Sequence, residues 1–277
     1  MKNNFSQRLK TAMDSIRAQT DLTADLAIVI GSGLKPVLDQ VTVTHRIHYS
    51  DIAEFPVSSA PSHAGELIFG VLAGRNVVAM NGRAHLYEGH TSDDVILPIY
   101  ALAQLGAPTI IITNASGGLR ADLNVGVPVL IADQLNFTGQ HPLAGPNDDE
   151  LGMRFPDMSR LYDRQLRDMA RKVAQDMGNR LASGIYAAIH GPEFETNAER
   201  RFLRLAGGDM VGMSSALEAA AARHAGMRVL GFSVITNSAT GGPEQQPDSI
   251  EEVLENAGIG APIVANVIVE MIRRDLL

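Results

Sequence analysis

The sequence contains no cysteine and no tryptophan. Without cysteine there can be no disulfide framework, no thiolate nucleophile and no cysteine-based metal cluster, and a reducing compartment is expected. Charged residues are also scarce, at 19% against a typical value of about 25%. The net charge is −8 and no basic block is present. General attraction to nucleic-acid backbones is therefore not expected, and any bound anion must be held by local groups.

Segments typical of export or membrane insertion are missing as well. Residues 1–19 alternate charged and apolar side chains like a soluble amphipathic helix and contain no apolar run. The longest uncharged stretch, 95–119, is interrupted by Pro98 and Gly106, and is better described as a buried helix followed by a strand. These features predict a cytoplasmic location and no membrane partner.

The length of 277 residues allows one large domain or two small ones. With 45% hydrophobic residues, either could bury a sizeable core. No repeat or linker divides the chain, so we expect a single domain over 1–277. Apolar runs predict strands at 26–31, 41–49, 66–72, 76–82, 109–114, 127–133, 184–189 and 228–237. Helical patterns at 161–177, 197–207 and 214–226 fall between several of these runs, which indicates an α/β fold.

The run 66–82 predicts a hairpin that turns at 73–75, so the sheet is expected to be mixed. The segment 139–159 is rich in Gly, Pro and Asp and predicts a long loop, which in compact domains is usually functional. Gly258, Gly260 and Pro262 are expected to interrupt the last helical pattern.

Short runs of small and polar residues follow several strands, where ligands of α/β proteins gather. Gly31-Ser32-Gly33 lies between a strand and an expected helix, so its backbone N–H groups and hydroxyl could bind an anion. An ordinary tight turn explains it equally well. A dinucleotide-binding loop is disfavoured, because Pro36 replaces the third glycine of that motif.

The motif at 81–90 offers a second cluster of polar side chains. If the strand continues, Arg83, His85 and Tyr87 share one face and could contact a phosphate and a sugar. A solvated polar edge is the alternative. Metal sites built from His45 with His48, or from His85 with His90, are not expected, because carboxylates at ligand spacing are missing.

Three later segments add candidate ligands. The small residues of 113–119 let the backbone approach a ligand. Phe194 and Glu195 place an aromatic ring beside a carboxylate, and Met213-Ser214 precede a helix, where anions are favoured. Taken singly, Glu195 could instead cap the following helix and Met213 could belong to the core.

Taken together, these motifs closely resemble the trimeric purine nucleoside phosphorylases, whose relatives include the methylthioadenosine phosphorylases. The resemblance runs from about residue 25 to 237 and rests on the segments GSGL, PSHAGEL, GRAHLYEG, TNASGGL, GPNDDELGMRFPDMS, GPEFET, VGMSS and ARHAGMRVLGFSVITN. It implies a partly barrel-like mixed sheet flanked by helices. It also implies a pentosyltransferase that cleaves purine nucleosides with inorganic phosphate as co-substrate, giving free base and pentose 1-phosphate, without metal or organic cofactor.

The resemblance also assigns roles to individual residues. Phosphate would be bound by Ser32, His63, Arg83, His85, the Ala115 backbone N–H and Ser214. The nucleoside would be bound by Tyr87, Phe155, Phe194, Glu195, Met213 and Asn237, with Phe155 reaching the site of a neighbouring subunit in a homotrimer. Asn237, Glu195 and His85 would be the catalytic residues.

The chemistry of the two base-binding residues favours 6-oxopurines such as hypoxanthine and guanine. Ionised Glu195 only accepts hydrogen bonds, so it matches N1–H of a 6-oxopurine and not the acceptor N1 of adenine. Asn237 can donate to O6 and accept from protonated N7, which stabilises the departing base.

Some positions depart from the family pattern. Ile250 stands where many members have a histidine that contacts the 5′-hydroxyl, Ser238 where lysine is common, and His190 where a smaller residue is frequent. A methylthioadenosine-type phosphorylase, with a different base and 5′ pocket, is therefore the alternative activity. A non-catalytic purine-binding or phosphate-binding protein is a third, weaker hypothesis, because both sets of binding residues are present.

Overall fold

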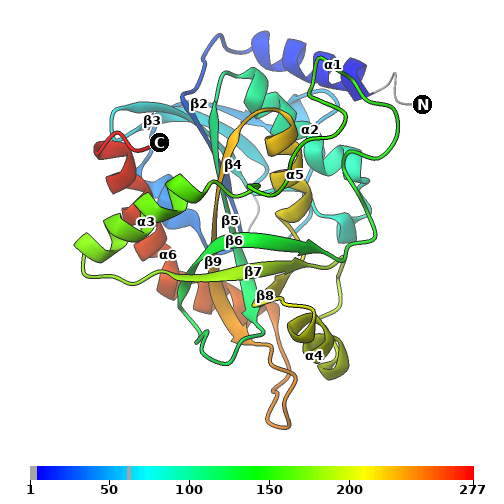
Figure 1. The fold of residues 1–277 in the computed structure, drawn as a ribbon. Coiled ribbons are helices and arrows are strands. Elements are labelled where there is room, and N and C mark those ends of the chain that lie inside the picture. Colours follow the sequence, from blue (N-terminus) through cyan, green and yellow to red (C-terminus); the bar gives the residue numbers. More distant parts are fainter. Residues whose placement is uncertain (1–4, 61–63) are drawn as a thin grey trace.

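A single mixed sheet of nine strands forms the centre of the computed structural model, which describes residues 5–60 and 64–277 (Figure 1). The strands are β1 (Leu26–Ile30), β2 (Thr42–His48), β3 (Glu66–Leu72), β4 (Arg75–Asn81), β5 (Thr109–Gly118), β6 (Pro128–Asn136), β7 (Ala182–Ala188), β8 (Met210–Gly212) and β9 (Arg228–Ser238). Their order in the sheet is β2-β3-β4-β1-β5-β8-β7-β6-β9. The predicted α/β class and mixed sheet are confirmed.

Helices cover both faces of this sheet (Figure 1). They are α1 (Phe5–Arg17), α2 (Ser92–Gln104), α3 (Arg164–Asp176), α4 (Asn197–Leu205), α5 (Ala216–His224) and α6 (Ile250–Arg273), with short 3₁₀ helices η2 (Lys35–Gln40), η3 (Tyr49–Asp51) and η4 (Leu86–Glu88). The helices expected within 161–177, 197–207 and 214–226 are all present as α3, α4 and α5.

The second half of the sheet closes on itself. Strand β5 pairs with β8, β8 with β7, β7 with β6 and β6 with β9, and β9 returns to pair in parallel with β5. This ring is the barrel-like part that the resemblance implies. It leaves β5 between the barrel and the open half of the sheet, so residues of β5 can reach a site shared by both parts.

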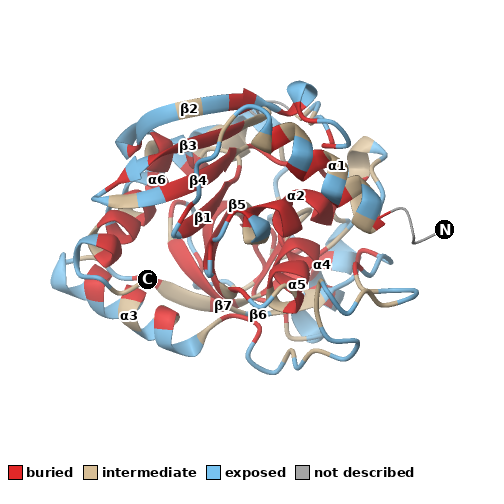
Figure 2. Cartoon of the chain, turned by 90° about the horizontal axis from the view of Figure 1, so that it is seen from above, coloured by how far each residue is buried: buried red, intermediate tan, exposed pale blue. Residues whose placement is uncertain are grey.

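Apolar residues on both faces of the strands explain the layered core. In β1, Ala27 and Val29 pack with residues of α1, α2 and α5, while Leu26, Ile28 and Ile30 pack with residues of η2, α3 and α6. Alternate residues of a strand point to opposite faces, so a strand buried on both sides is apolar throughout. Figure 2 shows the inner strands buried and the edge strand β2 largely exposed.

The hairpin predicted at 73–75 is present. β3 and β4 pair in antiparallel register from Glu66–Asn81 to Leu72–Arg75, so the turn itself consists of Ala73 and Gly74. Both have positive φ, 49° and 91°, which matches the two-residue turns that fit the twist of a β-hairpin.

Several local expectations were wrong. The strand expected at 109–114 continues to Gly118, because the small residues that follow Asn114 also pair with β9. Residues 83–87 do not extend β4, which ends at Asn81 before Gly82 takes a positive φ of 98°. The helix after Gly33 is a 3₁₀ helix, with Pro36 near its start.

The last helix is also longer than the sequence suggested. Gly258, Gly260 and Pro262 lie inside one continuous helix, α6. An internal proline costs about 3 kcal/mol, but α6 buries a row of Val and Ile side chains, each contributing about 1.5–3 kcal/mol. A Cβ on Gly260 would lie 2.9 Å from the Val234 side chain, so glycine permits close contact with β9.

Among the described residues, α6 is also the one helix long and apolar enough to cross a membrane by length and composition. Its buried residues pack against β9, η2 and α3, as expected for a core helix of a folded domain. The segment 95–119, considered above on sequence grounds, forms most of α2 and β5.

Candidate functional site

A cavity of about 330 Å³ opens at the carboxyl ends of β1, β5 and β9, next to the segment that follows β4. These four strands are parallel neighbours, so their carboxyl ends meet at one edge of the sheet, where α/β proteins bind ligands. The predicted phosphate-binding residues that line it are Ser32, Arg83, His85, Ala115 and Ser214. The predicted nucleoside-binding residues that line it are Tyr87, Phe194, Glu195, Met213 and Asn237.

Two predicted site residues are not in this cavity. His63 lies outside the described residues. Phe155 lies on the long loop 139–159, which contains no helix or strand, and its ring is 85% exposed with the Arg154 guanidinium 5.5 Å from its centroid. It does not line the cavity of its own chain.

Arg83 supplies the buried positive charge of the site. Its side chain is 2% exposed, and its Nη2 donates to Thr113 O at 2.6 Å. Its Nη1 donates to Ser215 Oγ at 2.9 Å and lies 3.1 Å from Glu218 Oε2 on α5. These contacts fix the guanidinium at the cavity wall, where its positive charge can attract an anion.

Ser215, which sequence reasoning missed, organises this wall. Its Oγ accepts from Arg83 Nη1 and from Asn114 Nδ2, at 2.9 and 2.8 Å. Its φ of 63° is unusual for a residue other than glycine and occurs at the start of α5. Such strain persists only where the surroundings enforce it, and it is typical of ligand-binding sites. The adjacent pair Ser214-Ser215 was visible in the sequence, but its conformation was not.

His85 is held by Glu88, a residue of the motif at 81–90 to which the sequence analysis gave no role. Glu88 Oε1 accepts from the His85 backbone N–H and lies 2.8 Å from its ring Nδ1. Burial alone would raise the pKa of Glu88, but hydrogen bonds from His85 and Ser59 outweigh it and hold the pKa well below its usual range. The carboxylate favours a proton on Nδ1 and so fixes the orientation of the His85 ring.

Tyr87 stacks on the His85 ring, with centroids 4.6 Å apart. Burial and the nearby Glu88 raise the pKa of Tyr87 to about 12, so its hydroxyl stays neutral and can donate a hydrogen bond. Although the expected strand does not form, the three side chains Arg83, His85 and Tyr87 all reach the cavity.

Glu195 and Asn237 also line the cavity. The Glu195 side chain is 5% exposed and lies 3.4 Å from Arg200 Nε. Burial and the charge of Asp248 raise the pKa of Glu195, while a backbone hydrogen bond and Arg200 oppose the rise. Asn237 follows a register shift in the β5–β9 pairing, opposite Gly117.

The alternative roles of Glu195 and Met213 can be compared with the structure. Thr196, and not Glu195, caps α4, in a capping box with Glu199. Met213 is partly exposed and lines the cavity, so it is not a core residue. Both side chains are therefore placed where a ligand could contact them.

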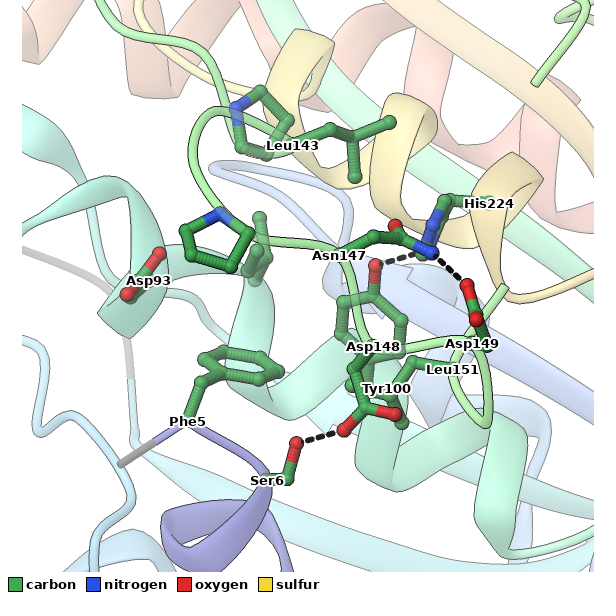
Figure 3. Close-up of a pocket in the computed structure, with 13 residues that line it drawn as sticks. Phe5, Ser6, Asp93, Tyr100, Leu143, Asn147, Asp148, Asp149, Leu151 and His224 are labelled. Carbon is green, nitrogen blue, oxygen red and sulfur yellow. Dashed lines mark hydrogen bonds between the residues drawn. The ribbon is translucent and has the colours of Figure 1, made fainter. Parts of the chain in front are cut away.

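A larger cavity of about 560 Å³ lies elsewhere, between α1, α2, α5 and the loop 139–159 (Figure 3). Tyr100 bonds His224 there at 2.6 Å, and Ser6 bonds Asp148. Asp148 and Asp149 lie at its rim, and no Lys or Arg is among the described residues that line it. It is unsuited to a phosphate, so the smaller cavity is the better candidate.

No group of three or more His, Asp or Glu side chains able to hold a metal ion is found within the described part of the chain.

Comparisons with known proteins agree with the motifs. The profile of the phosphorylase superfamily matches residues 25–273. Purine nucleoside phosphorylase 1 of Bacillus subtilis (strain 168) is 43% identical over 251 residues, 91% of this chain and 92% of that protein. Purine nucleoside phosphorylase of Bos taurus is 44% identical over 244 residues, covering 86% and 84%. These relatives do not favour the methylthioadenosine-type alternative.

Solved structures give the same result. The crystal structure of a schistosoma purine nucleoside phosphorylase in complex with hypoxanthine superposes with a TM-score of 0.91 at 37% identity, covering 97% of both chains. A Schistosoma mansoni purine nucleoside phosphorylase in complex with inosine gives a TM-score of 0.90 at 36% identity, covering 97% of this chain and 96% of that one.

Proposed function

The chain belongs to the phosphorylase superfamily, with purine nucleoside phosphorylases as its relatives, and from this premise we propose that it cleaves 6-oxopurine nucleosides with inorganic phosphate. The products are the free base, such as hypoxanthine or guanine, and ribose or deoxyribose 1-phosphate. One observation carries the proposal: a single cavity is lined by a buried arginine, a buried carboxylate and an amide.

The part of the cavity next to Arg83 is the proposed phosphate site. Arg83 supplies the charge, and Ser32, His85, the Ala115 backbone N–H and Ser214 supply further hydrogen bonds. His63 completes this set in the proposal. Phosphate is itself the nucleophile, so the site needs to position it and does not need a second carboxylate to activate water.

The nucleoside lies across the rest of the cavity. Tyr87 and Met213 contact the ribose and Phe194 faces the purine. Ile250 also lines the cavity, so the surface offered to the 5′ group is apolar at that point.

Glu195 and Asn237 bind the base and act in the chemical step. Glu195 accepts N1–H, while Asn237 donates to O6 and accepts from N7–H. Negative charge moves onto the purine as the glycosidic bond breaks, so hydrogen bonds to the base strengthen in the transition state. His85 bonds the attacking phosphate, and its orientation is fixed by Glu88.

No metal or organic cofactor takes part in the proposed reaction. We therefore expect purine release from inosine to require phosphate and to be unaffected by chelators. The measurement is to incubate the protein with inosine, guanosine, xanthosine, adenosine or methylthioadenosine, with and without phosphate, and to identify the released bases. Equal release without phosphate would indicate a hydrolase, and faster release from methylthioadenosine would indicate the alternative substrate class.

The proposed assembly is a homotrimer in the cytoplasm, with Phe155 entering the site of a neighbouring chain. The almost complete exposure of Phe155 supports a contact with another chain, because large aromatic side chains are usually buried. Light scattering at micromolar concentration should give three times the mass of the chain. Phe155→Ala should raise KM for inosine and leave the Arg83 contacts intact, whereas a fully active monomer would contradict the role of Phe155.

A further inference from the structure

Two charged residues behind the proposed base site, Arg200 and Asp248, have no role in the function described so far. Arg200 lies on α4, and Asp248 precedes Ser249, the residue that caps α6. Their side chains are only 3% and 5% exposed, and neither lines the cavity. Buried charges are costly unless they are paired and hydrogen-bonded, so their placement needs an explanation.

The two residues connect the two base-binding side chains to each other. Asn237 Nδ2 donates to Asp248 Oδ1 at 2.6 Å, and Arg200 Nη2 donates to the other oxygen, Asp248 Oδ2. Arg200 Nε lies 3.4 Å from Glu195 Oε2. The result is a continuous buried chain from Asn237 through Asp248 and Arg200 to Glu195.

Asp248 removes the ambiguity in the orientation of the Asn237 amide. An ionised carboxylate only accepts hydrogen bonds, so the NH₂ end of the amide must face it. On the other side, Thr236 Oγ1 donates to Asn237 Oδ1 at 3.0 Å in this orientation. With the amide reversed, its oxygen would face the carboxylate oxygen of Asp248, and the hydrogen bond to Asp248 would be lost.

The loop that carries Asp248 is anchored at both ends. Gln245 Nε2 donates to Ser238 O at 2.6 Å, and Arg201 Nη1 donates to Gly241 O at 2.6 Å. Ser249 accepts from the Glu252 backbone N–H at the start of α6. A Cβ on Gly241 would lie 3.0 Å from Arg200 Cβ, so the loop packs directly on α4.

We propose that Asp248 and Arg200 are positioning residues for base recognition: Asp248 fixes the Asn237 amide in one orientation, and Arg200 holds Asp248 and Glu195 as a carboxylate pair. This inference rests on the proposed function, because it concerns how Asn237 and Glu195 distinguish a 6-oxopurine from a 6-aminopurine. Within the loop 239–249, it assigns Asp248 to specificity.

Arg200 and Asp248 act on Glu195 in opposite directions. They are the charged groups among the described residues that perturb Glu195, from α4 and from the loop; Arg200 lowers its pKa and Asp248 raises it. Glu195 must be ionised to accept N1–H, so kcat/KM for inosine is lost as pH falls through the pKa of Glu195. Protonated Glu195 donates instead, which suits the acceptor N1 of adenine.

The test measures kcat and KM for inosine and adenosine between about pH 5 and 9, and calorimetric binding of hypoxanthine over the same range. Arg200→Met should move the acid limb of the pH profile of kcat/KM for inosine to higher pH. On that limb it should also reduce the preference for inosine over adenosine. Asp248→Asn should move the acid limb to lower pH and reduce kcat for inosine by about 10-fold or more, because a charged hydrogen bond to Asn237 is replaced by a neutral one that can reverse.

Controls separate these effects from damage to the fold. Glu244→Gln removes one charge from the same loop, and Glu244 is not among the described hydrogen-bond or ion-pair partners of Asn237 and Arg200, so its pH profile should match that of the wild type. Thermal unfolding reports whether each variant is folded. If Arg200→Met unfolds, the double variant Arg200→Met/Asp248→Asn removes both buried charges, and its acid limb should lie at higher pH than that of Asp248→Asn, because Arg200 lowers the pKa of Glu195.

Opposite shifts of the acid limb would support the proposal. The proposal would be overturned if the acid limbs did not shift, or shifted in the same direction, while activity fell equally for inosine and adenosine. That result would mean that Arg200 and Asp248 only stabilise the fold. In that case a wild-type protein that still cleaves inosine leaves the proposed function intact. A wild-type protein that neither cleaves inosine nor binds hypoxanthine would overturn the proposed function and this inference together.

Discussion

Replacing Asn237 with alanine is expected to reduce kcat for inosine by roughly 10²–10³-fold, the usual effect of removing one preorganised hydrogen-bonding group from a developing charge. Its bond to the purine strengthens only as the base gains negative charge, so KM should change much less than kcat. Steady-state kinetics at saturating phosphate measures both. A larger change in KM than in kcat would assign Asn237 to ground-state binding.

Asn237→Asp tests recognition of position 6 directly. The new carboxylate can still accept N7–H but repels a 6-oxo group, so activity should shift toward 6-amino nucleosides. The result should also depend on pH, because Asp248 Oδ1 lies 2.6 Å from Asn237 Nδ2 and would lie close to the new carboxylate. Two carboxylates at such a distance share a proton at low pH. The shift should therefore grow as pH rises, and an unchanged ratio of inosine to adenosine activity at high pH would mean that other residues contact position 6.

The sequence was sufficient to predict the strands and helices that are defined by a pattern of neighbouring residues. β3, for example, has the predicted bounds of 66–72, since an apolar run followed by a two-residue turn defines both a strand and its hairpin. The same holds for the positions of Ser32, Arg83 and Asn237, because polar residues after parallel strands meet at one sheet edge. The roles assigned to them stay predictions.

Features set by distant pairing were not predictable in this way. β8 has only three residues, too short for any periodicity, and forms because β5 and β7 both pair with it. The segment 113–118 contains small and polar residues that favour a turn, but pairing with β9 makes it a strand. α6 continues through Pro262 because its apolar side packs against β9.

The partners of the site residues were missed for the same reason. Glu218 reaches Arg83 from a helix far along the chain, and Asp248 reaches Asn237 from a loop without a regular pattern. A buried Glu in the alanine-rich sequence of α5 was a usable signal, because a charge on the buried face of a helix requires a partner. The identity of that partner depends on the fold.

The pair of Arg83 and Glu218 gives the second large expected effect. Both side chains are almost completely buried, at 2% and 1% exposure, and Nη1 lies 3.1 Å from Oε2. Arg83→Met leaves the Glu218 carboxylate buried without its cation. Removing one member of a buried ion pair costs about 3–5 kcal/mol, so the free energy of unfolding should fall by this amount, and phosphate binding should be lost because Arg83 is its proposed cation.

The double variant Arg83→Met/Glu218→Gln separates stability from binding. It removes both charges and keeps similar volumes, and neutral replacements of buried ion pairs are often tolerated. Denaturant unfolding should therefore show most of the lost stability restored, while calorimetric titration with phosphate should still show no binding. Recovery of phosphate binding in the double variant would mean that Arg83 serves the fold alone. Conversely, a Glu218→Gln variant should bind phosphate, because Arg83 keeps its hydrogen bonds to Ser215 and Thr113 and so stays at the cavity wall.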